Sequence, residues 1–221
     1  GLARHGFSGA RYILEGPQGL YAATCRNPKP MELKDGWRMG EVSFKPWGAC
    51  RHAHPAIDAA LELKARGGLN GDVRVETYAD AIAFCDRPAP NTVHEAKFSI
   101  QHAVAVVAER GVPRLADFEP DAIAELTTAR ERVTVIESPD FTGRYPAHFG
   151  ARLSTEDGEV SLVDTRGDPE RPLSEDGVLA KARELMTWGG LDESEASRAI
   201  DIALNGDEPR EITKMLESWL S

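Results

Sequence analysis

The sequence lacks any apolar run as long as a membrane span, and it has few cysteines. Its 221 residues include three cysteines, Cys25, Cys50 and Cys85. Their odd number and wide spacing fit neither a disulfide framework nor a zinc site. The sequence also has no secretory signal. These features indicate a protein of a reducing compartment, and we expect it to be cytoplasmic and not associated with a membrane.

Positive charge is also scarce. Lysine and arginine number 26 against 36 acidic residues, which gives a formal net charge of −10. A nucleic-acid partner is not expected, because binding to the phosphate backbone requires a basic surface. Twelve of the acids lie between Glu156 and Glu195, and this run is typical of a solvated face.

Several catalytic signatures are missing. The early glycines, Gly6 to Gly19, follow no strand and do not have dinucleotide-binding spacing. No Gly-x-Ser-x-Gly elbow supports a serine triad. Cys50, His52 and His54 are too few for a zinc site without a further ligand at a recognisable spacing nearby. We therefore expect neither a metal nor a cofactor.

The hydrophobic pattern predicts an α+β lobe with a mostly antiparallel sheet, covered by helices on one face. Strands are expected over 42–45, 72–78, 132–137, 148–154 and 159–164, with a hairpin turn at Glu156 to Gly158. Helices are expected over 55–65, 92–111, 120–130, 174–187, 192–205 and 209–219. Residues 79–85 fit more than one structure.

This pattern divides the chain into three parts. Residues 1–40 are interpreted as the end of a helical domain and a hinge. Residues 41–165 form the α+β domain, and 166–221 form helices that return to the helical domain. Because the chain starts with Gly-Leu-Ala and has no initiator Met, we expect it to be a piece of a longer polypeptide or a split subunit.

One loop concentrates the reactive side chains. Between the first expected strand and helix lie Lys45, Cys50, Arg51, His52 and His54. Pro55 suits the first helical position, which makes His54 the expected N-cap and aims the helix N-terminus at the loop. Free N–H groups and the helix dipole favour an anion there. Two imidazoles and two cations beside an anion site indicate acid–base chemistry on a carboxylate.

Three stretches resemble the MmgE/PrpD family, in particular its lid domain. They are Leu14–Ala22, the loop and helix over Phe44–Ala60, and Thr92–Ala105. The resemblance extends over nearly the whole chain. The family includes 2-methylcitrate dehydratase, cis-aconitate decarboxylase and iminodisuccinate epimerase, so the resemblance implies a lyase or isomerase. It also implies a large helical domain joined to an α+β lid, with the active site between them.

The resemblance carries over to particular residues and partners. His54 matches the lid histidine that decarboxylase and epimerase relatives place in the cleft, which implies a catalytic role. His102 stands where several relatives carry tyrosine, and it is the second catalytic candidate. The implied partners are a small carboxylate substrate, the missing N-terminal helical domain and a second copy in a homodimer, with no metal.

Each candidate has a structural alternative. His54 is either a proton-transfer group or a helix cap, and Asp58 is placed either to orient its ring or to face solvent. Arg51 and Lys45 either bind carboxylate or form internal pairs, and His52 either reaches the cleft or is exposed. His102 lies on a buried helix, where a hydrogen-bonded core histidine is common. A non-catalytic anion-binding or partner domain remains the alternative to an enzyme.

Overall fold

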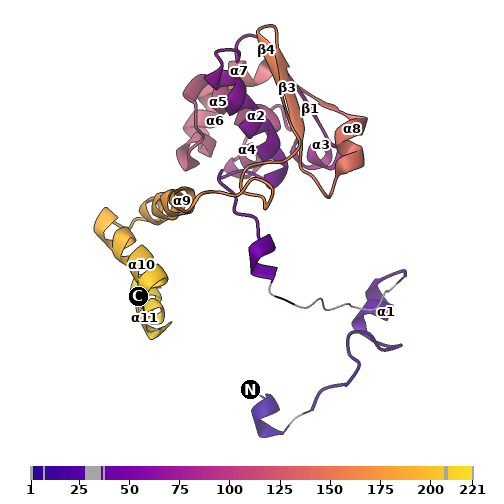
Figure 1. Ribbon diagram of the computed structural model, residues 1–221, viewed down its shortest axis with the longest axis vertical. Coiled ribbons are helices and arrows are strands. Elements are labelled where there is room, and N and C mark those ends of the chain that lie inside the picture. The colour runs from indigo at the N-terminus through magenta and orange to yellow at the C-terminus, as the bar shows by residue number, and fades with distance from the viewer. Residues whose placement is uncertain (1, 7, 28–35, 37, 207–208, 221) are drawn as a thin grey trace. The chain divides into compact units, whose positions relative to one another are not determined.

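The computed structural model describes residues 2–6, 8–27, 36, 38–206 and 209–220 (Figure 1). The chain divides into two compact units, Gly1–Met39 and Gly40–Ser221. The first unit contains η1 (Leu2–His5) and α1 (Leu20–Thr24), and η2 (Arg38–Glu41) begins in it and ends in the second unit. Large apolar side chains are exposed on this unit, namely Tyr12, Ile13, Leu14 and Leu20.

The second unit is built on a four-stranded sheet in the order β2-β1-β3-β4. Its strands are β1 (Val73–Thr77), β2 (Val133–Glu137), β3 (Ala151–Thr155) and β4 (Gly158–Leu162). β1 pairs in parallel with β2 and antiparallel with β3, and β3 and β4 form the expected hairpin. The mostly antiparallel α+β lobe predicted from the sequence is thus confirmed.

Alternation along the strands gives the sheet one buried face. In β1, Val73 and Val75 are buried and Arg74 is exposed, as a half-buried strand requires. Two long helices, α2 (His54–Ala65) and α5 (Ile100–Arg110), pack together on the buried side (Figure 1). α5 is buried from Ile100 to Val107, so the prediction of an apolar, enclosed helix is correct.

Shorter helices complete the lobe. They are η3 (Arg51–Ala53), α3 (Ala79–Cys85), α4 (Val93–Lys97), η4 (Leu115–Phe118), α6 (Pro120–Glu125), α7 (Thr127–Glu131) and α8 (Pro139–Arg144). The segment 79–85, ambiguous in sequence, is helical. The helix predicted over 92–111 is two helices, because Ser99 leaves helical geometry and caps α5 by accepting a hydrogen bond from the His102 N–H.

One expectation at the start of the lobe is wrong. Residues 42–45 are not a strand, although the Phe44 N–H donates a single hydrogen bond to the Gly167 carbonyl.

The last helices follow the prediction closely: α9 (Glu175–Trp188), α10 (Glu193–Asn205) and α11 (Pro209–Leu220). Ser174 and Asp192 cap α9 and α10 as expected. None of the helices within the described residues is long and apolar enough to cross a membrane.

Candidate functional site: the loop from Lys45 to His54 and its cavity

Lys45 and His54 meet at one backbone carbonyl. His54 is the first residue of α2, and its side chain is 1% exposed. Its Nε2 and the Lys45 Nζ each lie 3.2 Å from the Ala49 oxygen. A carbonyl can only accept, so Nε2 carries the proton and the neutral ring has its lone pair on Nδ1. Among the described residues, no partner is recorded for Nδ1.

The electrostatic surroundings keep His54 neutral. Burial lowers its pKa to about 4, and the cations of Lys45 and Arg51 act in the same direction, while the Ala49 carbonyl opposes them. Desolvation disfavours the imidazolium, which explains the sign of the shift. At neutral pH the ring is therefore a proton acceptor, though a weak one until negative charge is brought near it.

The prediction that His54 caps a helix is wrong. The turn η3 runs directly into α2, and the N-cap residue of α2 is Ala53. The Ala53 N–H donates to the Cys50 carbonyl and the His54 N–H to the Arg51 carbonyl. Because the preceding turn already satisfies these donors, the start of α2 is not the open anion site expected from the sequence.

Arg51 forms an internal ion pair. Its guanidinium lies 2.5 Å from the buried Asp168 carboxylate and covers the Phe149 ring at 3.7 Å from the centroid. Asp168 follows β4 and has no sequence signal linking it to the loop. Its carboxylate already occupies the guanidinium face that a substrate would use. The contacts therefore match the ion-pair alternative for Arg51.

His52 belongs to an aromatic cluster. Its Nδ1 lies 2.8 Å from the Tyr78 hydroxyl, and its ring stacks on Phe84 at 5.1 Å between centroids. Partial burial lowers the pKa of His52, an effect that Asp80 opposes and Arg51 reinforces. Tyr145 and Phe149 lie against the same ring. His52 and Arg51 thus both contact the Phe149 ring.

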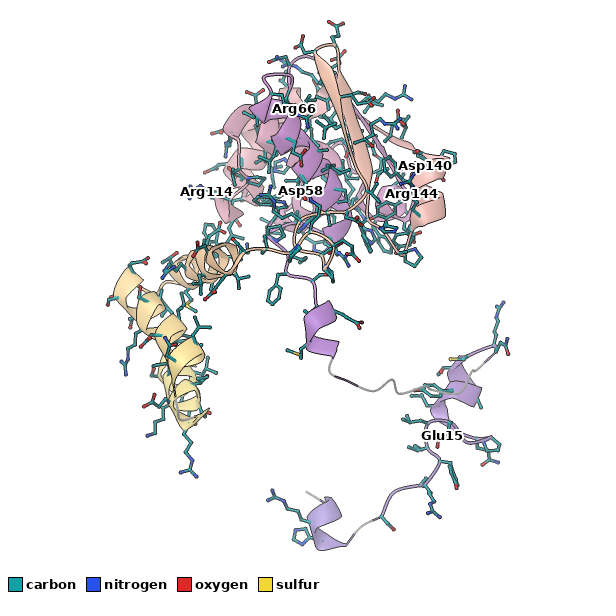
Figure 2. All side chains as sticks on the ribbon, in the orientation of Figure 1. Glu15, Asp58, Arg66, Arg114, Asp140 and Arg144 are labelled. Carbon is teal, nitrogen blue, oxygen red and sulfur yellow. The ribbon has the colours of Figure 1, made fainter. Side chains whose placement is uncertain are left out.

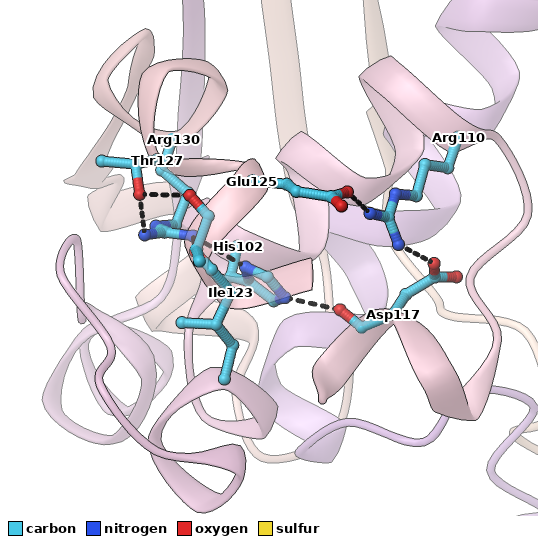
Figure 3. A network of polar contacts seen from close by, with 8 residues as sticks. His102, Arg110, Asp117, Ile123, Glu125, Thr127 and Arg130 are labelled. Carbon is cyan, nitrogen blue, oxygen red and sulfur yellow. Dashed lines mark hydrogen bonds and ion pairs between the residues drawn. The ribbon is translucent and has the colours of Figure 1, made fainter. Parts of the chain in front are cut away.

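His102 lies in the core of the lobe, where both ring nitrogens are engaged (Figure 3). Nε2 donates to the Asp117 carbonyl at 2.7 Å, and Nδ1 lies 3.3 Å from an Arg130 nitrogen. Burial is the main reason that the pKa of His102 is lowered. Arg130 also donates to the Ile123 carbonyl and Thr127. These contacts match the core alternative for His102.

Asp58 anchors the loop rather than the His54 ring. It is buried in α2 (Figure 2), where it accepts hydrogen bonds from the Trp47 indole at 3.1 Å and the Thr165 hydroxyl at 3.0 Å. The Arg166 N–H is a third donor at 2.5 Å. Neither expected role, ring orientation nor solvent exposure, is correct. The carboxylate instead joins the segment that enters the lobe to the segment that leaves it.

A cavity of about 450 Å³ opens beside Lys45. Lys97 of α4 and Lys181 of α9 also line it, and its described lining includes no acidic residue. The rest of the lining is largely apolar: Phe44, Trp47, Gly48, Leu115, Leu173, Val178 and Leu185. In a chain with a net charge of −10, three ammonium groups around one apolar cavity favour an organic anion.

Two of these lysines, Lys97 and Lys181, were not selected as candidates from the sequence. Lys181 lies within the acidic run between Glu156 and Glu195. Val178, Lys181 and Leu185 are three and four residues apart on α9, so a lysine on an apolar helix face was the available signal. Among the described residues, no group of three or more His, Cys, Asp or Glu side chains is arranged to hold a metal ion.

The comparison with family models decides the classification. The model of the MmgE/PrpD C-terminal domain matches residues 47–208. The chain belongs to the MmgE/PrpD family. The match runs from Trp47, at the cavity, through the sheet to α10, so the chain contains the C-terminal part of an MmgE/PrpD protein. A search of the curated proteins found no match.

Proposed function

We propose that this MmgE/PrpD chain is the substrate-binding and catalytic lobe of an enzyme that acts on a small di- or tricarboxylate. The reaction would begin with removal of a proton next to a carboxylate and continue by loss of water, loss of CO₂ or reprotonation. The observation that carries this proposal is the cavity lined by three lysines, with no acid in its described lining, beside the Ala49 carbonyl that Lys45 and His54 share. We propose that no metal or other cofactor takes part.

In this mechanism the lysines bind and the histidine moves the proton. Ammonium groups of Lys45, Lys97 and Lys181 hold substrate carboxylates and stabilise the negative charge that develops when the neighbouring carbon loses its proton. His54 accepts that proton at Nδ1. A bound polyanion offsets the two cations that depress the His54 pKa, so binding raises the basicity of the ring when it is needed.

The remaining sequence-predicted residues take supporting roles in this proposal. Arg51 and His52 act through the aromatic cluster that fixes the loop, and His102 supports α5 from the core. We further propose that a helical domain or subunit packs on residues 1–40 and 166–221 and covers the cavity, and that the enzyme is a homodimer. Exposed apolar side chains on Leu185, Trp188, Leu204 and Leu216 support such packing.

The burial of His54 favours a second candidate, in which the lobe binds carboxylates without reacting. The two functions are separated by incubating the complete enzyme in D₂O with methylcitrate, cis-aconitate or iminodisuccinate. NMR then detects loss of the proton next to a carboxylate, whichever bond is broken later. Exchange that disappears in His54→Gln, with carboxylate binding retained, is the result expected of the enzyme. If the protein binds these acids without proton exchange or turnover, the non-catalytic, carboxylate-binding function is the correct one.

Carboxylate binding itself is tested by calorimetry on lysine variants. Lys97→Met should weaken binding by roughly tenfold, because it removes one cation from a cavity with no acid in its described lining. Lys181→Met should weaken binding less, because the Lys181 Nζ already lies 3.6 Å from the Glu184 carboxylate. Lys214→Met is the matched control, since this exposed lysine of α11 lies outside the cavity. Equal affinity for all three variants and the unmodified chain would place carboxylate binding elsewhere.

A further inference from the structure

Two cysteines that are 35 positions apart in sequence come together beside the loop. Cys50 is the residue before η3, and Cys85 is the last residue of α3, an element in contact with η3. Cys50 packs against the buried core cluster that includes Cys85, and the two thiols shift each other's pKa. Cys85 is fully buried in the core, whereas Cys50 is only partly buried. Cys25 is exposed and lies in the first unit.

The two cysteines differ in the pKa of their thiols. The neighbouring Cys85 thiol lowers the pKa of Cys50 to about 6, helped by the His52 amide and Lys45, while burial opposes the shift. The Cys50 side chain and its charge, together with burial, raise the pKa of Cys85. At neutral pH the pair therefore holds one thiolate, at Cys50, and one proton, at Cys85. A thiolate at the start of a helical run near a lysine is a reactive arrangement.

We propose that Cys50 is a site of reversible oxidation by peroxide and that Cys85 resolves it into an intramolecular disulfide. The partly exposed sulfur is the one that a small oxidant reaches, and the buried sulfur belongs to the core cluster against which Cys50 packs. This pairing does not depend on the proposed function, because neither cysteine is assigned to substrate binding or proton transfer.

The chemistry balances in two steps. The Cys50 thiolate attacks one oxygen of hydrogen peroxide, which forms the sulfenic acid and releases hydroxide. The Cys85 sulfur then attacks the Cys50 sulfur, the S–OH bond breaks, and the thiol proton leaves with the hydroxyl group as water. One thiolate and one thiol are oxidised to the disulfide, and one peroxide is reduced to one hydroxide and one water; the hydroxide then takes a proton from the solvent. Loss of the Cys50 charge in the first step removes one cause of the raised Cys85 pKa and so favours the second.

The disulfide would fasten the site loop to α3. The Cys50 N–H already donates to the Lys97 carbonyl at 2.7 Å, and its neighbour Ala49 supplies the carbonyl shared by Lys45 and His54. A covalent bond at Cys50 therefore fixes a residue adjacent to both groups. The loop could not move independently of α3 until a thiol reductant reopened the bond.

Peptide mapping of the 221-residue chain tests this. The chain is treated with one equivalent of hydrogen peroxide, and free thiols are then blocked with N-ethylmaleimide. We expect Cys50 and Cys85 to lose maleimide labelling in equal amounts, to appear in one linked peptide, and to recover with dithiothreitol. Cys25 should remain labelled. Oxidation of Cys25 at the same rate as Cys50, or loss of the Cys50 thiol with Cys85 still free, overturns the proposal.

Variants assign the order of the steps. Cys85→Ser and Cys85→Ala should leave a sulfenic acid at Cys50 that dimedone traps, and Cys50→Ser should leave Cys85 reduced. Cys25→Ser is the matched control and should form the disulfide at the rate of the unmodified chain. Without oxidant, iodoacetamide at pH 7 should modify Cys50 about tenfold faster than an ordinary cysteine of equal exposure. A denaturation curve for each variant confirms that it is folded. The peptide-mapping test on the unmodified chain does not depend on any of these variants.

Discussion

Lys45 and His54 bind the same carbonyl oxygen, that of Ala49, at 3.2 Å each. This shared acceptor fixes the tautomer of His54 and places a cation close to its ring. The histidine is consequently neutral and only weakly basic in the lobe alone. The negative charge of a substrate bound in the cavity that Lys45 lines would make His54 a stronger base.

Stability should depend on pH through His54. Its pKa falls from 6.5 to about 4 on folding, so the unfolded chain binds a proton that the folded chain does not between these values. The free energy of unfolding is therefore expected to be highest above pH 6.5 and to fall as the pH approaches 4. For this buried group the loss is roughly 3 kcal/mol. Burial gives His52 and His102 shifts of the same sign.

Urea denaturation from pH 7.5 to pH 4 measures this dependence. His54→Gln keeps an N–H donor for the Ala49 carbonyl but has no proton to gain, so its curve should be flatter than that of the unmodified chain. His94→Gln, at an exposed position of α4, should keep the full slope. An unchanged slope in His54→Gln would contradict the assigned pKa.

His102→Ala should unfold more easily rather than lose only activity. The substitution leaves the buried Asp117 carbonyl without its donor, removes one of the contacts of Arg130 and deletes a large core side chain, which costs about 2–4 kcal/mol. His148→Ala is the control, because His148 pairs with Asp164 at a side chain 41% exposed and should change stability by less than about 1 kcal/mol. A stable His102→Ala protein with no turnover would restore the catalytic prediction.

Asp58→Ala should be among the most destabilising single changes. Three donors, from Trp47, Thr165 and Arg166, lose their common buried acceptor. We expect a cost of about 3–5 kcal/mol in chemical denaturation. Asp140→Ala removes a carboxylate from the surface of α8 (Figure 2), where its partner is the exposed Arg144, and should cost less than about 1 kcal/mol. Similar costs for the two variants would argue against the anchoring role of Asp58.

Gly167→Ala should loosen the junction between the loop and the end of the sheet. Gly167 has a φ of +94°, and a methyl group there would collide with the Phe44 carbonyl. A strained backbone and a clash together predict a loss of about 2–4 kcal/mol. Gly143→Ala, within α8 and with open space around the added carbon, should be neutral or slightly stabilising by comparison. Thermal melts of the two variants provide the measurement.

The C-terminal helices should make the isolated chain associate. Trp188 and Leu216 are 55% and 46% exposed, and apolar side chains of this size on adjoining helices favour burial against another surface. Light scattering should show a concentration-dependent mass that falls in Trp188→Lys and Leu216→Lys. Ser194→Lys, an equal charge change at an exposed position of α10, should have no such effect. A monomer at all concentrations would weaken the proposed helical partner.

The sequence by itself determined most of the regular structure. Alternation of Val73 and Val75 with Arg74 defined a strand, and capping residues such as Ser174 and Asp192 placed helix starts, because these signals act over one turn or one strand. Family membership was also readable from short runs such as Phe44–Ala60. The loop of Lys45 and His54 could be singled out for the same reason.

Only the tertiary structure decided what each side chain of that loop contacts. Asp168 reaches Arg51, Cys85 reaches Cys50, and Lys181 reaches the cavity of Lys45 across more than thirty intervening residues in each case. No local pattern encodes such pairings, because they depend on how distant elements pack. Burial, which makes His54 neutral and encloses His102, likewise arises only when α2 and α5 close against the sheet.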